Sequence, residues 1–111
     1  MSRRIIKSEL ALADLEEQAE YIRQRSPAAA LRFLDGAEAL FRQLAAMPGI
    51  GERFESTNPL LDDLRRSSIP KFPSIVAYYR PLEDGIIVIR VLHGARDIER
   101  ILGQGGPDDE I

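Results

Sequence analysis

Hydrophobic residues recur every three or four positions in two stretches of the chain, and this spacing predicts two amphipathic helices. The first runs from Glu9 to Arg25 behind Ser8, and the second runs from Pro27 to Met47 behind Ser26. Both serines are suited to capping a first helical turn. The predicted buried stripes are Leu12, Leu15, Ala19 and Ile22 in the first helix, and Ala30, Phe33, Leu34, Ala37, Leu40, Phe41 and Leu44 in the second. Because almost no chain separates the helices, we expect them to pack as an antiparallel hairpin.

Stretches rich in β-branched and aliphatic residues predict four strands. They cover residues 3–7, Leu64–Ile69, Phe72–Arg80 and Ile86–Leu92, and the last is aliphatic at every position except Arg90. Such a run is typical of a strand buried on both faces, so we expect it in the middle of the sheet.

The residues Glu83-Asp84-Gly85 predict a tight hairpin loop before this strand, and the loop length sets the register. A three-residue loop pairs Leu82 with Ile86, Arg80 with Val88, Tyr78 with Arg90, and Val76 with Leu92. The more uniformly apolar face is expected to meet the helices; it carries Ile75, Ala77, Tyr79, Ile89, Val91 and His93. Tyr78, Arg80 and Arg90 are therefore predicted to cluster on the face away from the helices.

Together these elements predict an α+β fold of order β-α-α-β-β-β-α, with the helical hairpin packed on one face of a small antiparallel sheet. Gly94 permits a sharp turn after the last strand, and Asp97 is suited to capping a short final helix. The 111 residues are enough for one core, which we place in a single domain over residues 1–102. Residues 103–111 are acidic and without apolar pattern, so we expect a mobile tail.

Composition narrows the possible chemistry. The chain has no cysteine and one histidine, which rules out a disulfide or thiolate metal site and argues against a zinc enzyme. No cofactor fingerprint is present, so no cofactor or metal is expected. No apolar run is long enough to cross a membrane and no export signal is evident, so we expect a soluble, cytoplasmic protein.

The net charge of −3 is unevenly distributed. Residues 1–63 carry 8 basic and 11 acidic groups, whereas residues 64–102 carry 7 basic and 4 acidic groups. The sheet region is therefore the basic part. A protein that grips a nucleic-acid backbone usually has a strongly basic balance, which this chain lacks.

Several polar residues are candidates for function, and each also has a structural interpretation. Arg90 inside an aliphatic strand either stacks on Tyr78 or binds a partner. His93 is a residue type that can act as a general acid or base, but the absence of an evident orienting group favours a structural role. Arg96 can pair locally with Asp97. Arg65, Arg66 and Lys71 fit either a phosphate patch or a charged, solvated strand edge.

Three segments together with the order of elements closely resemble the ParE/RelE superfamily of type II toxins. They are Leu-Arg-Arg-Ser-Ser-Ile (64–69), Ile-Val-Ala-Tyr-Tyr-Arg (75–80) and Arg-Val-Leu-His-Gly-Ala-Arg-Asp-Ile (90–98). The likeness covers residues 3–102, and the last segment is similar to the ParE, or plasmid-stabilisation, branch. The resemblance implies a small bacterial toxin that a cognate antitoxin, ParD-like or of another type II kind, holds inactive with an acidic and apolar C-terminal segment.

The superfamily divides by target, and the resemblance leaves three functions open. Ribosome-dependent ribonucleases of the RelE type use basic strand residues, an arginine after the last strand and often a tyrosine on the last helix. Arg65 and Arg96 match two of these places, whereas Ser74 and Leu102 stand where an arginine and the tyrosine are expected. This departure from the ribonuclease pattern favours a ParE-like inhibitor of DNA gyrase. Such a toxin is not an enzyme; it acts by binding gyrase and causes growth arrest. The alternatives are an mRNA endoribonuclease acting at the ribosome, and a non-toxic module that only binds antitoxin.

The possible functions predict different site residues. No catalytic residue is assigned for a gyrase inhibitor, while a ribonuclease would use Arg65, His93 and Arg96. The candidates for target binding are Tyr78, Arg80, Arg90, His93 and Arg96. The candidates for antitoxin binding are Leu12, Leu15, Phe33 and Phe41 on the helical hairpin, with salt bridges to Arg80 and Arg90.

Overall fold

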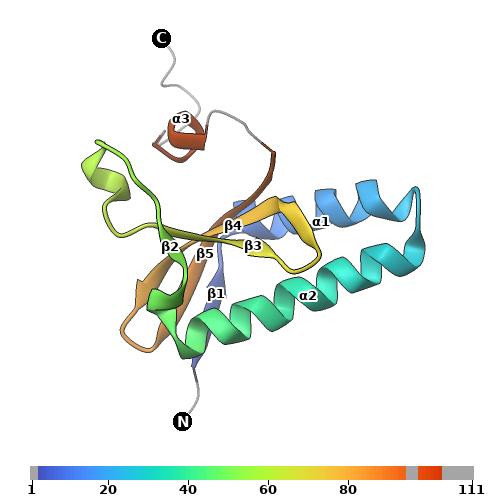
Figure 1. The fold of residues 1–111 in the computed structure, drawn as a ribbon, viewed down its shortest axis with the longest axis horizontal. Coiled ribbons are helices and arrows are strands. Elements are labelled where there is room, and N and C mark those ends of the chain that lie inside the picture. Colours follow the sequence, from blue (N-terminus) through green and yellow to red (C-terminus); the bar gives the residue numbers. More distant parts are fainter. Residues whose placement is uncertain (1–2, 95–97, 104–111) are drawn as a thin grey trace.

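Two long helices lie against one face of a five-stranded sheet in the computed structural model, which describes residues 3–94 and 98–103 (Figure 1). The elements in chain order are β1 (Arg4–Lys7), α1 (Glu9–Arg23), α2 (Pro27–Ala46), the 3-10 turn η1 (Pro48–Ile50), β2 (Glu52–Arg53), the 3-10 turn η2 (Pro59–Leu61), β3 (Arg65–Ile69), β4 (Phe72–Leu82), β5 (Gly85–His93) and α3 (Ile98–Gly103). This arrangement confirms the predicted α+β class. The polar stretch after α2 adds the two-residue strand β2, which was not predicted.

Both helices begin where the sequence predicts. The Ser8 side chain accepts a hydrogen bond from the Ala11 N–H, and the Ser26 side chain accepts one from the Ala29 N–H. Pro27 follows as the first residue of α2, where its missing N–H costs nothing. The two serines therefore fix the start of each helix and the sharp reversal between them.

The sheet has the order β1-β5-β4-β3-β2, so β4 rather than β5 is the central strand. β1 runs parallel to β5, from the pair Arg4 and Gly85 to the pair Lys7 and Val88, while the other neighbours are antiparallel. The sheet is therefore mixed rather than wholly antiparallel. The sequence predicts the antiparallel pairs because short turns connect β3, β4 and β5. It does not predict the direction of β1, because both helices lie between β1 and the other strands in the chain, and β1 pairs along the remaining edge of β5.

The predicted register is correct at one end of the β4–β5 hairpin and wrong at the other. Tyr78 pairs with Arg90 and Val76 with Leu92, as predicted, but Arg80 pairs with Ile87 and Leu82 with Gly85. The loop contains two residues rather than three, and a β-bulge at Ile89 between the two halves restores the register. As a result Ile86 and Val88 join the core under the helices, and Ile89 packs on the opposite face, the reverse of the prediction.

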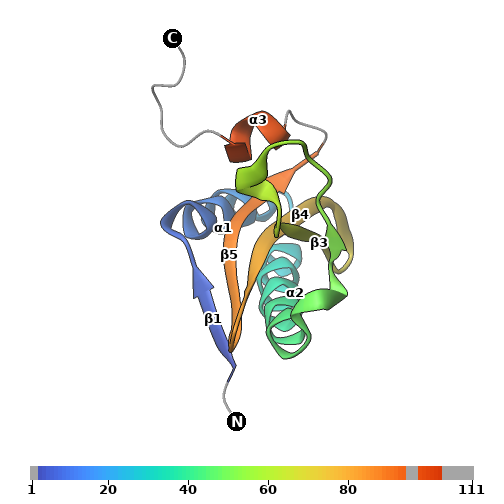
Figure 2. The same ribbon diagram turned by 90° about the vertical axis from the view of Figure 1, so that its left-hand side faces the viewer.

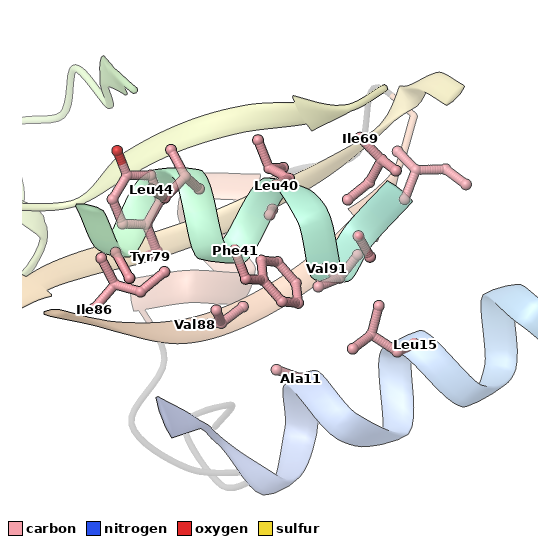
Figure 3. Packing of buried hydrophobic residues seen from close by; sticks show 14 of the residues in the cluster. Ala11, Leu15, Leu40, Phe41, Leu44, Ile69, Tyr79, Ile86, Val88 and Val91 are labelled. Carbon is pink, nitrogen blue, oxygen red and sulfur yellow. The ribbon is translucent and has the colours of Figure 1, made fainter. Parts of the chain in front are cut away.

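The main core lies between the helical hairpin and the sheet. Phe41 and Leu44 of α2 face Tyr79, Val88 and other strand residues, while Ala11 and Leu15 of α1 close the core near Val91 (Figure 3). Burial of one large aliphatic or aromatic side chain contributes about 1.5–3 kcal/mol, so this cluster supplies most of the stability of the fold. In the part of the chain that the structure describes, no helix is both long and apolar enough to cross a membrane.

Candidate partner-binding site

A second, smaller apolar cluster lies on the face of the sheet opposite the helical hairpin. Its buried members are Leu61, Leu64, Tyr78 and Leu92. The segment between β2 and β3, together with α3, covers it on the side away from α2 (Figures 1 and 2). The ring of Phe54 meets that of Tyr78 edge to face, with centroids 5.9 Å apart. Irregular segments rather than long helices therefore close this face.

Arginines hold these irregular segments against the strands. Arg80 donates from Nε to Asp63 Oδ1 at 2.8 Å and from Nη2 to the Leu60 carbonyl. Arg66 pairs with Glu52 at 3.3 Å, and its guanidinium lies 5.7 Å from the centroid of the Phe54 ring. Arg66 and Arg80 thus lie at the edge of the second cluster. Their side chains are partly exposed, and their contacts hold the segment between β2 and β3 against the strands.

Arg90 has a partner that the sequence analysis did not identify. Its Nε and Nη2 donate to the two carboxylate oxygens of Asp14 in α1, at 2.8 and 3.0 Å, and the Val91 N–H donates to the same carboxylate at 2.9 Å. Asp14 is only 6% exposed. The hydrogen bonds that Arg90 donates to Asp14 raise the pKa of Arg90 against the opposing effect of burial, so its guanidinium stays charged.

This pair corrects the predicted cluster of Tyr78, Arg80 and Arg90. Arg90 remains opposite Tyr78 in the register, but its guanidinium contacts the helical layer. β1 ends at Lys7, so the edge of β5 beyond Val88 has no strand beside it. Ser8 and Asp14 bond to that edge instead, and Arg90 joins them there. Asp14 lies outside the stripe predicted for the first helix, so the charge of Arg90 within an aliphatic strand was the sequence signal for a contact here.

Arg65 is used to anchor the chain after α2. Its Nη1 donates to the carbonyls of Gly49 and Gly51, at 3.2 and 2.7 Å. The hydroxyl of buried Tyr79 accepts from the Gly51 N–H at 2.9 Å and donates to the Pro48 carbonyl at 2.7 Å. A Cβ at Gly51 would collide with the Tyr79 ring, so only glycine fits there. Arg65 of β3 and Tyr79 of β4 thus both tie η1 and Gly51 to the sheet.

His93 lies far from Arg65 although both are on the helical face of the sheet. Arg65 pairs with Tyr79 on β4, whereas His93 pairs with Ile75 from the other side of that strand. Four residues along a strand span about 13 Å. The exposed His93 side chain instead lines a hollow with Gln18 and Tyr21 of α1. The proposed nuclease residues Arg65 and His93 are therefore not brought together.

Three further predictions concern residues outside the described ranges. They are the roles given to Arg96, the capping of the final helix by Asp97, and the mobile tail. Gly94 has a positive φ of 74°, as expected for the turn that follows β5. Within residues 3–94 and 98–103, no group of three or more histidine or carboxylate side chains is placed to hold a metal ion.

The apolar candidates for antitoxin binding differ in how far a partner can reach them. Phe33 and Phe41 are 0% exposed and Leu15 is 7% exposed, because all three belong to the main core. Leu12 is 51% exposed. Leu15, Ala19 and Ile22 face the core as predicted, but Ala11 takes the buried place expected for Leu12. On the folded domain a partner can therefore contact Leu12, whereas Leu15, Phe33 and Phe41 hold the core together.

Comparison with known proteins places these observations in a family. Residues 5–98 match the sequence profile described as the ParE toxin of the type II toxin-antitoxin system, parDE. The chain belongs to the ParE toxin family. The match spans the domain from β1 to the start of α3 and includes every strand. A search of curated proteins gives no match to this ParE-family chain.

A solved structure shares the fold. It is described as the chromosomal ParDE TA system from P. aeruginosa, with 18% sequence identity and a TM-score of 0.65 over 84% of this chain and 97% of that chain. At this identity the likeness concerns the fold alone. This ParE-family chain therefore has the architecture that the resemblance implied, a helical hairpin on one face of a curved sheet.

Proposed function

We propose that the protein is the toxin of a cytoplasmic type II toxin-antitoxin pair, that it inhibits DNA gyrase by protein–protein contact, and that a cognate antitoxin neutralises it. Membership of the ParE toxin family supports the toxin assignment. The proposed action on gyrase requires a binding surface and no bond-breaking group. Inhibition would follow from stabilising the complex of gyrase with cleaved DNA.

The contacts of Arg65 are the observation that favours gyrase over RNA as the target. Its Nη1 donates to two backbone carbonyls, which hold the guanidinium beside η1 and leave only Nε and Nη2 for a phosphate. Ser74 occupies the place of a second basic group, and Leu102 packs against the second apolar cluster where a nuclease would have a tyrosine. A transition state with extra negative charge needs several converging donors, so this arrangement supports binding rather than RNA cleavage.

The proposed target surface is the face that carries Arg80. We propose His93, which lies at the end of β5 on the helical face, and Arg96, which is outside the described residues, as separate contacts with the target. The Arg80 side chain is 31% exposed and bridges to an exposed carboxylate, so its charge is available to a partner. Tyr78 and Arg90 contribute mainly by holding the strands in place, because Tyr78 is buried and Arg90 is paired with Asp14. Arginines at the rim of an interface mainly affect the association rate and its salt dependence.

For the antitoxin we propose an interface on the accessible part of the helical hairpin near Leu12, with salt bridges to Arg80 and Arg90. An acidic partner must compete with Asp63 for Arg80 and with Asp14 for Arg90. Because Asp14 makes three hydrogen bonds and Asp63 is exposed, we expect Arg80 to contribute more to binding than Arg90.

Expression of the chain in bacteria with and without its antitoxin tests this proposal. We expect growth arrest with filamentation and induction of a DNA-damage reporter, relieved by the antitoxin. Arg80→Ala should reduce both effects, whereas Arg42→Ala, which removes an exposed arginine on α2, should leave them unchanged.

Two other results would contradict the proposal. Codon-phased mRNA cleavage in stalled ribosomes, abolished by Arg96→Ala, would establish a ribonuclease. Harmless overexpression of soluble, folded protein would point to a module that only binds antitoxin. Circular dichroism of each variant shows whether a loss of toxicity reflects a loss of folding.

A further inference from the structure

The free end of the helical hairpin carries an open groove on its outer side. The groove has a volume of about 790 Å³ and lies between the second half of α1 and the first half of α2. Figure 1 shows this end of the hairpin projecting beyond the strands. Its apolar lining includes Ala13, Ala19 and Ala30 together with Leu31 and Leu34.

The leucines of the groove are accessible although the helices pack closely. Leu31 is 64% exposed and Leu34 is 37% exposed, while Phe33 between them is fully buried in the core. Small residues on both helices leave room above the line where the helices meet. Two antiparallel helices with such a groove offer the same packing surface that a third helix uses in a helical bundle.

The rim of the groove on α1 is acidic. Glu16, Glu17 and Glu20 all line it, and only Glu20 has a salt-bridge partner in the described part of the chain, namely Arg23. Glu16 and Glu20 are four residues apart on one helix, where like charges destabilise by a few tenths of a kcal/mol. A basic group bound over the rim would relieve this repulsion.

We propose that this groove is a docking site for a basic amphipathic helix of a partner protein. Leucine-sized side chains of that helix would fill the space between Leu31, Leu34 and the alanines, and lysines or arginines beside them would pair with Glu16 and Glu17. The groove is separate from the surface around Arg80. The proposal therefore does not depend on gyrase being the target.

The charges also argue against two other occupants. A two-fold dimer through the groove would bring each patch against its own copy, and so would place two acidic rims together. An acidic segment would meet the same repulsion. A helix with basic flanks is the partner that matches both the shape and the sign of the charge.

Designed peptides provide the test, with the full chain labelled with ¹⁵N. The probe is a helical peptide with leucines on one face and lysines beside them. Its controls are a twin with glutamate at every lysine and a scrambled lysine peptide. Amide shifts locate the binding site, and fluorescence anisotropy at low and moderate salt gives the affinities.

We expect the lysine peptide to bind at least about tenfold more tightly than its glutamate twin, with weaker binding as salt rises. Amide shifts should fall within residues 13–34. Leu31→Gln should weaken binding about fivefold or more, whereas Leu60→Gln, at a leucine that is 68% exposed on η2, should have little effect. Replacing Glu16 and Glu17 by Gln should remove most of the preference for lysine.

Four results would overturn the proposal. They are equal or tighter binding of the glutamate twin, equal binding of the scrambled peptide, no binding of the lysine peptide at any soluble concentration, and sedimentation showing a dimer that Leu31→Gln disrupts. The last would assign the groove to a second copy of this chain. Thermal unfolding of each variant shows that the substitution has not changed the fold.

Discussion

The two faces of the sheet are closed in different ways. On one face, two long helices cover a continuous core that includes Phe33, Phe41 and Tyr79. On the other, a smaller cluster around Tyr78 and Leu64 is covered by the segment between β2 and β3 and by the six-residue helix α3. The helical face, with the larger core, therefore supplies most of the stability of the domain. The opposite face, whose cover depends on a few arginine contacts, is better suited to exchanging its contacts with a partner.

The largest expected difference between the faces is the cost of a cavity. We predict that Phe41→Ala lowers the free energy of unfolding by about 3–5 kcal/mol, because neighbouring helices and strands cannot collapse into the space. Leu64→Ala should cost about 2–3 kcal/mol, since irregular segments can adjust. Urea unfolding of both variants measures the difference. Equal losses would show that the two faces are equally rigid.

The contact between Arg90 and Asp14 joins the helical layer to the edge of β5. We predict that Asp14→Ala destabilises the domain by about 3 kcal/mol, because a largely buried guanidinium and the Val91 N–H lose their acceptor. Asp35→Ala, which removes an exposed carboxylate on α2, should cost less than about 0.5 kcal/mol. A double-mutant cycle with Arg90→Ala isolates the coupling. A coupling energy near zero would contradict a structural role for the pair.

Tyr79 connects the helical face to η1. Tyr79→Phe should cost about 1–2 kcal/mol, because the Gly51 N–H loses its acceptor and the Pro48 carbonyl loses its donor. Unfolding experiments on the variant test this value. A variant as stable as the parent would exclude the hydroxyl as an anchor.

Alkaline pH offers a second measurement on the same residues. Burial raises the pKa of the Tyr79 phenol above its usual value of 10.0, against the opposing effects of the Gly51 hydrogen bond and Arg65. Burial likewise raises the pKa of Tyr78, opposed by the charge and hydrogen bond of Arg66. Unfolded tyrosine loses its proton first, so stability should be fully present below pH 10 and fall as pH rises beyond it. The fall should be smaller in Tyr79→Phe.

The smallest expected effect lies outside both clusters, in the turn between β3 and β4. Lys71 has a φ of +70°, a conformation that is costly for any residue with a Cβ. Lys71→Gly should therefore raise stability by about 0.5–1 kcal/mol, measured by thermal unfolding. Lys71→Ala keeps the strain while removing the charge, and should change stability by less than about 0.5 kcal/mol. A gain from alanine instead would assign the effect to charge.

The fold could be predicted from the sequence because its strongest signals are local. The spacing of apolar residues in α2 and the capping serines Ser8 and Ser26 act within one or two helical turns. The structure confirms both serines and the predicted stripe of α2, except for Leu34, which is exposed. The β-bulge could not be predicted, since Ile89 resembles every other aliphatic residue of its strand. Its presence decides which of Ile86, Val88 and Ile89 face the helices.

The site was harder to predict because its contacts join distant segments. Asp14 and Arg90 are 76 residues apart. Asp14 lies outside the predicted apolar stripe of its helix, and only Arg90 interrupts an apolar run. Arg65 was predicted to be either a phosphate ligand or a surface charge, yet it binds backbone carbonyls whose positions depend on the turn after α2. Side-chain type alone cannot indicate whether an arginine meets backbone, carboxylate or solvent.

Supercoiling of relaxed plasmid by purified DNA gyrase, with ATP and the folded full chain, tests the central claim most directly. We predict that supercoiling is lost and that linear DNA accumulates after the protein is denatured, because gyrase is trapped on cleaved DNA. Antitoxin should prevent both effects. Normal supercoiling in the presence of excess folded protein would contradict gyrase inhibition by this member of the ParE family.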